Sequence, residues 1–482
     1  MANKRVISNF IWRFAERSGA QGVKLVVELV LARLLLPEDY GSVALVAVFI
    51  TILNVFVDSG LASALIQKKN ADDLDFSSVF YFNIVWCCIL YCLLFATAPV
   101  ISAFYSRPEL TAMIRVLGLS VIISGVKNVQ QAFVSRNMQF KRFFFATLGG
   151  TLGAAVLGIV MAYLGFGAWA LIAQQLFNTA VDTLILWLTV KWRPKKVFSV
   201  HRLSSLLNYG WKLLLSSLLD TVYTNLRSLL IGKIYTTSEL AFYNQGEKYP
   251  NAVVGNINTS IDSVLLPTMS NEQDNAVRVK EMTRRAIKTS TYILAPLMMG
   301  LAATANSFVY LVLTAKWLPC IFYLRIFCIT YMFYPIHTAN LNAIKALGRS
   351  DMFLKLEIIK KVVGLALLAL TVGISVKAMA YSLLLSSVLC QMINAWPNRK
   401  LLNYGYWEQL KDILPNIVLA AVMGILVHCV EFLGWSAVPT LCVQVLLGAI
   451  LYVAGSMITK NDSFQYLWTI VKPMTQKIIP RK

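Results

Sequence analysis

The sequence predicts an all-α integral membrane protein with about 14 transmembrane helices. Of its 482 residues, 57% are hydrophobic and only 14% are charged, and the mean hydropathy is +0.64. Soluble globular domains contain about 25% charged residues. Apolar runs of about 20 residues, the length that crosses a ~30 Å hydrocarbon core as a helix, recur along the whole chain. The eight cysteines lie in or beside these runs without a CxxC pair, so we interpret them as small hydrophobic residues.

Polar, proline and glycine residues separate the apolar runs and set the helix boundaries. Examples are the segments 36–39, 106–109, 192–196 and 396–400. No separating segment is long enough for a soluble domain of about 50 residues. The predicted helices span residues 7–33, 40–66, 77–104, 110–134, 142–163, 167–190, 203–234, 239–268, 286–314, 318–344, 351–375, 378–396, 412–433 and 437–458.

The distribution of basic residues predicts the topology. Each segment is counted together with the two nearest residues of the helices beside it. With the N-terminus in the cytoplasm, the inward-facing segments then contain 26 Lys and Arg residues. The outward-facing segments contain only Arg33, Arg107, Lys233, Lys316 and Lys377. Such a bias is the positive-inside pattern, and an error of one helix would erase it. Both termini are therefore expected in the cytoplasm. This explanation of the formal charge of +21 is preferred to nucleic-acid binding, which needs a basic patch on a soluble face.

The chain contains a weak internal sequence repeat. Residues 33–41 after the first predicted helix resemble residues 233–243 after the seventh, and the exits of the fourth and tenth helices also resemble each other. This repeat predicts two six-helix lobes around a central cavity, followed by two C-terminal helices. The predicted divisions are 1–196 for helices 1–6, 197–400 for helices 7–12, and 401–482 for helices 13–14 with a basic cytoplasmic tail.

Charged residues inside the predicted spans mark candidate functional positions, because a charge in the bilayer centre costs about 2.5–3.5 kcal/mol. On helix 1, Arg13, Arg17, Lys24 and Glu28 share one face at 100° per residue. A second such stripe on helix 7 and a third on helix 8 contain Lys212, Asp220, Arg227, Glu247 and Asp262, with Lys248 beside the third. Other charges inside spans include Asp58, Lys127 and Asp182.

These stripes are expected to face one another across a hydrated cavity rather than face lipid. Thirteen basic and eight acidic residues within the spans make that interior net positive, which favours an anionic substrate. We predict substrate binding by Arg13, Arg17, Lys24, Lys212, Arg227 and Lys248. We predict ion coupling or charge balance by Glu28, Asp58, Asp220, Glu247 and Asp262. The alternative is that the stripes form salt bridges that only join helices.

The sequence gives little support for catalysis. The only histidines are His201, His337 and His428, with no HExxH pattern, and no Walker A motif is present. Neither a cofactor nor a bound metal is predicted. We therefore predict a transporter rather than an enzyme.

Six segments of the chain carry a family resemblance: Leu34–Gly41, Asp58–Lys69, Tyr243–Asn244, Leu265–Pro267, Gln273–Asp274 and Lys316–Trp317. These segments resemble Wzx-type polysaccharide flippases of the colanic-acid type, within the superfamily of multidrug, oligosaccharidyl-lipid and polysaccharide exporters. The resemblance spans essentially the whole chain.

The resemblance implies a two-lobed helical transporter in the bacterial inner membrane that works by alternating access. Its implied substrate is an oligosaccharide repeat unit on polyprenyl pyrophosphate, moved from the cytoplasmic to the periplasmic leaflet for surface polysaccharide synthesis. The expected partners are this lipid-linked oligosaccharide, membrane lipids, a polysaccharide polymerase and a chain-length regulator, with no nucleic acid. Alternatives are a lipid II flippase, a multidrug antiporter, for which the cavity should be net acidic, and a membrane-embedded polymerase or ligase, which needs larger outward loops.

Overall fold

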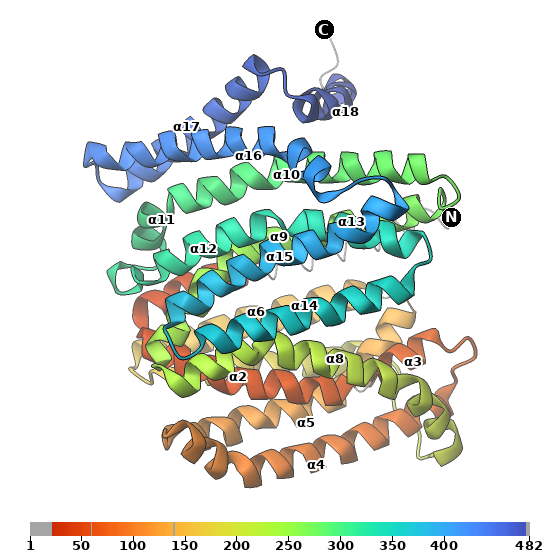
Figure 1. Cartoon of the computed structure of the whole chain (residues 1–482). Coiled ribbons are helices and arrows are strands. Elements are labelled where there is room, and N and C mark those ends of the chain that lie inside the picture. The colour runs from red at the N-terminus through yellow and green to blue at the C-terminus, as the bar shows by residue number, and fades with distance from the viewer. Residues whose placement is uncertain (1–21, 59, 138–139, 479–482) are drawn as a thin grey trace. The chain divides into compact units, whose positions relative to one another are not determined.

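The computed structural model describes residues 22–58, 60–137 and 140–478, and the regular secondary structure of this part of the chain is helical, without a β-strand (Figure 1). Residues 22–34 are helical. The remaining α-helices are α2 (Pro37–Asp58), α3 (Leu61–Gln67), α4 (Asp73–Tyr105), α5 (Glu109–Arg136), α6 (Phe140–Tyr163), α7 (Ala168–Thr189), α8 (Val200–Ile234), α9 (Thr237–Ser270), α10 (Ala276–Ala303), α11 (Ala305–Val312), α12 (Cys320–Met332), α13 (Tyr334–Ala346), α14 (Ser350–Thr371), α15 (Val376–Leu401), α16 (Tyr406–Cys429), α17 (Ala437–Ile458) and α18 (Asp462–Ile478). Short 3-10 helices follow α11 and α16 at Ala315–Trp317 and Val430–Leu433.

Every predicted helical range contains helix in the described residues, but three of them are interrupted. The second range divides into α2 and α3 before Gly60, whose φ of 68° is left-handed. The ninth divides into α10 and α11 at Thr304, and the tenth divides into α12 and α13 at Phe333, where Pro335 is the second residue of α13. α10 also starts ten residues before the predicted position 286, because the Asn275 side chain caps a charged first turn.

α18 was not predicted, because it is amphipathic rather than apolar throughout. In the described residues, nine helical stretches are long and apolar enough to cross a membrane, and residues 147–163 form a shorter apolar helix. The chain is thus a multi-pass membrane protein. The helices outside this set include α8, α9 and α14, whose polar residues lower their hydropathy, so the number of 14 spans stays a prediction.

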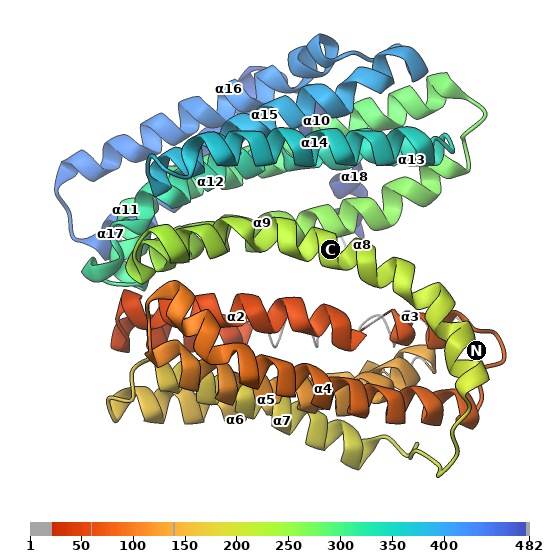
Figure 2. The same ribbon diagram turned by 60° about the horizontal axis from the view of Figure 1, so that its bottom comes forward.

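The chain clusters into two compact units, which divide between Ala241 and Phe242 within α9. In the first unit α4 packs on α5 and α8, α5 on α7, and α7 on α6, while α2 lies against α5 and α8 (Figure 2). Close helix contacts require glycine at several points. A Cβ on Gly125 of α5 would lie 2.4 Å from Cys87 Sγ of α4, for example. The apolar core of the first unit includes Leu61, Phe80 and Trp192.

The second unit repeats this order of neighbours. α10 packs on α12, α13 and α16, α12 and α13 on α15, and α15 on α14. α16 and α17 then pack together, and Figure 1 shows α10 and α16 running side by side. The helices α4, α5, α7 and α8 thus correspond in chain order and packing to α10, α12–α13, α15 and α16. The predicted boundary between the two lobes, at 196/197, lies before α8, whereas the two compact units divide within α9. The division into two six-helix lobes stays a prediction.

Candidate functional site

The stripe predicted on helix 7 lies on α8, a helix of 35 residues whose first turn is capped by the Ser199 side chain. Lys212 and Asp220 are exposed, whereas Arg227 is buried. At 1.5 Å per residue, Lys212 and Arg227 lie about 22 Å apart along the helix axis. α8 therefore carries two basic side chains whose separation along the helix is most of the ~30 Å thickness of the hydrocarbon core.

Arg227 is the most unusual residue of this stripe. Its exposed fraction is 9%, and its Nε and Nη2 atoms are buried without a hydrogen-bond partner among the described residues. A buried donor without an acceptor costs about 1–3 kcal/mol, and more when it is charged. A guanidinium is always charged and presents a planar set of donors that matches phosphate oxygens. Arg227 is therefore suited to an anionic ligand.

The predicted residues of helix 8 lie on α9 and belong to the second unit. Glu247 Oε1 accepts a hydrogen bond of 2.5 Å from the Tyr331 hydroxyl of α12. Lys248 is partly buried and makes further contacts, while Asp262 is exposed. Glu247 therefore links two helices of its own unit, and its role in ion coupling or charge balance stays a prediction.

Only part of the predicted helix 1 stripe is described. Lys24 is exposed and Glu28, four residues later, is partly buried and makes further contacts. Arg13 and Arg17 lie outside the described residues, so their assignment stays a prediction.

Asp58 ends α2 at the helix break and lines a cavity of the first unit with a volume of about 360 Å³. Polar residues from α3, α5 and α8 share the lining: Ser63, Asn128, Gln131, Ser135 and Ser217. The break lies against α8, because a Cβ on Gly60 would be 2.4 Å from the Gly210 carbonyl oxygen. Asn128 holds the last turn of α2 by donating a 3.0 Å hydrogen bond to the Val57 carbonyl.

A buried ion pair near Asp58 was not assigned from the sequence. Lys127 Nζ of α5 lies 3.0 Å from Asp182 Oδ2 of α7, and the two side chains are only 17% and 15% exposed. The charge of Lys127 also acts on Asp58. Both residues stood out in the sequence as charges within predicted spans. Their pairing could not be inferred, because it depends on how α5 packs against α7.

The corresponding helices of the second unit are joined by a neutral pair. His337 Nδ1 of α13 lies 3.0 Å from Asn394 Nδ2 of α15. This contact gives the His337 ring a polar partner within its own unit. In the described residues, no group of three or more His, Cys, Asp or Glu side chains could hold a metal ion.

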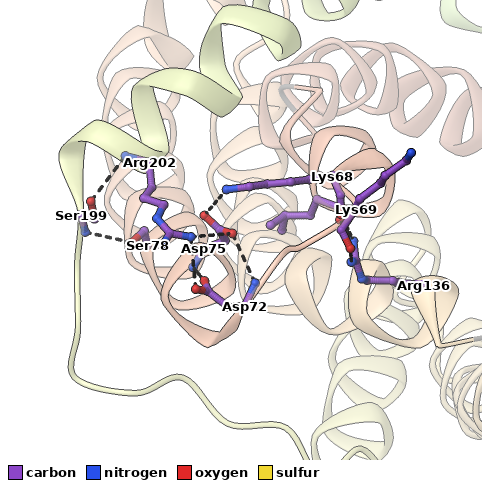
Figure 3. A network of polar contacts seen from close by, with 9 residues as sticks. Lys68, Lys69, Asp72, Asp75, Ser78, Arg136, Ser199 and Arg202 are labelled. Carbon is purple, nitrogen blue, oxygen red and sulfur yellow. Dashed lines mark hydrogen bonds and ion pairs between the residues drawn. The ribbon is translucent and has the colours of Figure 1, made fainter.

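Several basic residues near the predicted cytoplasmic ends have structural partners (Figure 3). The fully buried Asp75 carboxylate of α4 accepts from Lys68 Nζ at 2.7 Å and lies 3.4 Å from Arg202 Nη1 of α8. Arg136 at the end of α5 donates to the Leu65, Lys68 and Lys69 carbonyl oxygens.

Asp72 completes this network. It forms a capping box with Asp75 at the start of α4, and the Asp75 backbone N–H lowers the pKa of Asp72. Lys68, Arg136 and Arg202 thus join α3, α4, α5 and α8, so the arrangement of these basic residues serves the fold rather than a substrate.

Comparison with known proteins assigns the family. Residues 30–322 match the model of a family described as "Polysaccharide biosynthesis protein". The chain is 26% identical to the succinoglycan biosynthesis transport protein ExoT of Rhizobium meliloti over 65% of this chain and 64% of that protein. It is 24% identical to the lipopolysaccharide biosynthesis protein WzxC of Escherichia coli over 93% of this chain and 88% of WzxC.

A solved structure shares the fold. The lipid II flippase MurJ, in an inward closed conformation, superposes with a TM-score of 0.75 over 94% of this chain and 99% of MurJ, at 15% identity. This likeness shows the fold of a transporter. Together with the family match, it confirms the resemblance noted in the sequence: the chain is a multi-pass membrane protein that belongs to the polysaccharide biosynthesis protein family.

Proposed function

We propose that this protein moves a polyprenyl-pyrophosphate-linked oligosaccharide from the cytoplasmic to the periplasmic leaflet of the bacterial inner membrane by alternating access, without covalent chemistry. Its family, its helical transporter fold and its relatives in polysaccharide biosynthesis support the proposal. Both termini would lie in the cytoplasm, as the loop charges predict.

The observation that carries the proposal is Arg227. A guanidinium that is 9% exposed in a helix of a membrane protein, with two nitrogens lacking partners among the described residues, is poised for a multiply charged anion. A pyrophosphate supplies such an anion. Lys212 lies on the same helix about 22 Å away and would attract the head group at the opposite end of α8.

The charge balance disfavours a cation-drug antiporter of similar fold. Such a transporter needs carboxylates in excess where its substrate binds. Here the intramembrane charges are mainly basic, and the acidic residues Glu247 and Asp182 already have partners in the Tyr331 hydroxyl and the Lys127 ammonium.

The test is polymer export in a strain that lacks the endogenous protein and carries variants at Arg227. Loss of charge-assisted hydrogen bonds worth about 1.5–3 kcal/mol lowers export by about 10- to 100-fold in Arg227→Ala. Arg227→Lys keeps the charge and retains part of the activity. Protein abundance in the membrane is measured in parallel.

The matched control is Arg115→Ala. Arg115 is also an arginine within a span, but its Nε donates to the Phe95 carbonyl oxygen at 3.3 Å and its guanidinium stacks 4.0 Å from the Phe95 ring. This variant should keep most of the export. Normal export by Arg227→Ala at normal abundance would show that the proposed binding role is wrong.

A further inference from the structure

Three charged side chains of the first unit lie at a similar depth in the bilayer. Asp58, Lys127 and Asp182 lie about 11 to 14 Å, at 1.5 Å per residue, from the same end of the apolar stretches Pro37–Gln67 (α2 and α3), Glu109–Arg136 (α5) and Ala168–Thr189 (α7). Those ends are the predicted cytoplasmic ones. All three helices belong to stretches that are apolar enough to cross a membrane. The group is therefore well inside the hydrocarbon region rather than at its surface.

The charges of this group do not cancel when all three residues are ionised. Lys127 and Asp182 form a direct ion pair of 3.0 Å, which is mostly buried. Among the described residues, none donates a hydrogen bond or forms a salt bridge to the Asp58 carboxylate. The triad then has a net charge of −1, which is costly at this depth. One proton on a carboxylate makes it neutral.

The two carboxylates differ in their partners and in their access to water. Asp182 is held by Lys127, and its side chain is 15% exposed. Asp58 is exposed and lines the 360 Å³ cavity, so water can deliver a proton to it. The side chains that face it are Lys127, Asn128 and Gln131 from α5, Cys87 from α4, Ser63 from α3, and Ser217 from α8. Lys212 of α8 precedes the lining residue Leu213 in the sequence, but Lys212 itself does not line the cavity.

We propose that Asp58 is the proton-binding site that couples transport to the proton gradient, with Lys127 as its positioning residue and Asp182 as the anchor of Lys127. With Asp58 protonated, the triad is neutral and Lys127 stays with Asp182. Without that proton, Lys127 is attracted by both carboxylates and the contact between α5 and α7 is weakened. Binding and release of one proton thereby changes how α2, α5 and α7 are held together.

A proton fits the site better than Na⁺. A metal ion needs several oxygen ligands at close range and would have to bind beside the Lys127 ammonium, which repels it. A proton neutralises the carboxylate without a coordination shell. The inference rests on the proposed transport function, but proton binding by Asp58 can be measured without any substrate.

The first measurement is the infrared difference spectrum of the purified full-length protein between about pH 5 and about pH 8, a range that covers the titration of perturbed carboxyl groups. The wild type should show the band of one protonated carboxyl that is lost on deprotonation and is absent from Asp58→Asn. Asp274→Asn changes an exposed carboxyl between α9 and α10 and should leave the band unchanged. An identical band in Asp58→Asn would overturn the assignment.

The second measurement uses vesicles of phosphatidylethanolamine and phosphatidylglycerol that contain the protein and a fluorescent short-chain polyprenyl-pyrophosphate-linked N-acetylglucosamine. The ratio of the flipping rate with an imposed gradient of about one pH unit, a tenfold difference in proton concentration, to the rate without it is recorded. This ratio should exceed one in the wild type and fall to one in Asp58→Asn.

The outcomes separate the two proposals. A wild-type ratio above one that persists in Asp58→Asn overturns the coupling site and leaves the transport function standing. Stimulation of the wild type by a Na⁺ gradient alone overturns the proton assignment. If wild-type vesicles do not flip the probe at all, the transport function fails, and the infrared band still decides whether Asp58 binds a proton.

Discussion

Arg284 Nη2 of α10 lies 2.7 Å from Asp412 Oδ1 of α16, and the corresponding helices of the first unit are joined with the charges exchanged. There the acidic residue is Asp75 on α4 and the basic one is Arg202 on α8, with a contact of 3.4 Å. Each unit therefore has an ion pair between two of its packed helices, and the polarity of the pair is opposite in the two units.

The first prediction concerns the strength of the Arg284–Asp412 pair. The Asp412 side chain is 7% exposed and also accepts a 2.9 Å hydrogen bond from the Tyr404 hydroxyl. Burial raises the pKa of Tyr404, and the Asp412 charge raises it further, so the hydroxyl stays protonated and donates. A double-mutant cycle on unfolding in mixed micelles, with Arg284→Ala and Asp412→Ala, should give a coupling free energy of about 0.5–3 kcal/mol. Strictly additive effects would contradict this interaction.

The second prediction compares two neighbouring carboxylates of α4. Asp75 is fully buried and has two basic partners, whereas Asp73 is 47% exposed and pairs with Lys195, which is 65% exposed. Asp75→Asn should lower the free energy of unfolding by about 1.5–3 kcal/mol. Asp73→Asn should lower it by less than about 1 kcal/mol, because exposed pairs contribute little. Equal losses would mean that burial does not control the strength of these pairs.

The third prediction tests helix packing in the second unit. A Cβ on Gly246 of α9 would lie 2.6 Å from Tyr323 Cβ and 2.8 Å from the Leu324 backbone nitrogen of α12. Gly246→Ala should therefore force the helices apart and lower thermal stability, at a cost of about 1–3 kcal/mol.

Gly255 provides the matched control on the same helix, because a Cβ there meets no atom within 4 Å. Gly255→Ala should be neutral or stabilising by up to about 1 kcal/mol, through the better helix propensity of alanine. The two variants are compared by thermal denaturation of the purified protein. A Gly246→Ala variant as stable as Gly255→Ala would show that α9 and α12 do not pack this closely.

The fourth prediction concerns topology. Reporter fusions at Lys196, Arg278 and Arg399 should be cytoplasmic, and fusions at Arg107 and Lys377 periplasmic, because the basic loops face inward. Inverted results at two or more positions would show that the predicted number of helices is wrong.

Most helices could be predicted because the apolar run is a local property of the sequence. The break at Gly60 could not be predicted, because its φ of 68° depends on how α2 and α3 pack against α8. The division at Phe333 has a local signal in Pro335, in the first turn of α13, which the apolar run alone does not use. The final helix α18 was missed because an amphipathic helix lacks a continuous apolar run.

The candidate site was predicted only in part. Helical spacing placed Lys212, Asp220 and Arg227 on one helix, and all three lie on α8. Spacing alone did not show which of them would be buried, because burial depends on packing between helices. For the same reason, Lys127 and Asp182 were recognised as unusual charges but not as a pair.

The most direct test of the account is the sidedness of the lipid-linked oligosaccharide in the inner membrane of a strain lacking this protein, followed over time after the protein is restored. Without the protein, the lipid-linked oligosaccharide should accumulate in the cytoplasmic leaflet. With the wild type it should reach the periplasmic leaflet, and with Arg227→Ala at equal abundance it should do so about 10- to 100-fold more slowly. Equal sidedness with and without the protein would contradict the proposed function.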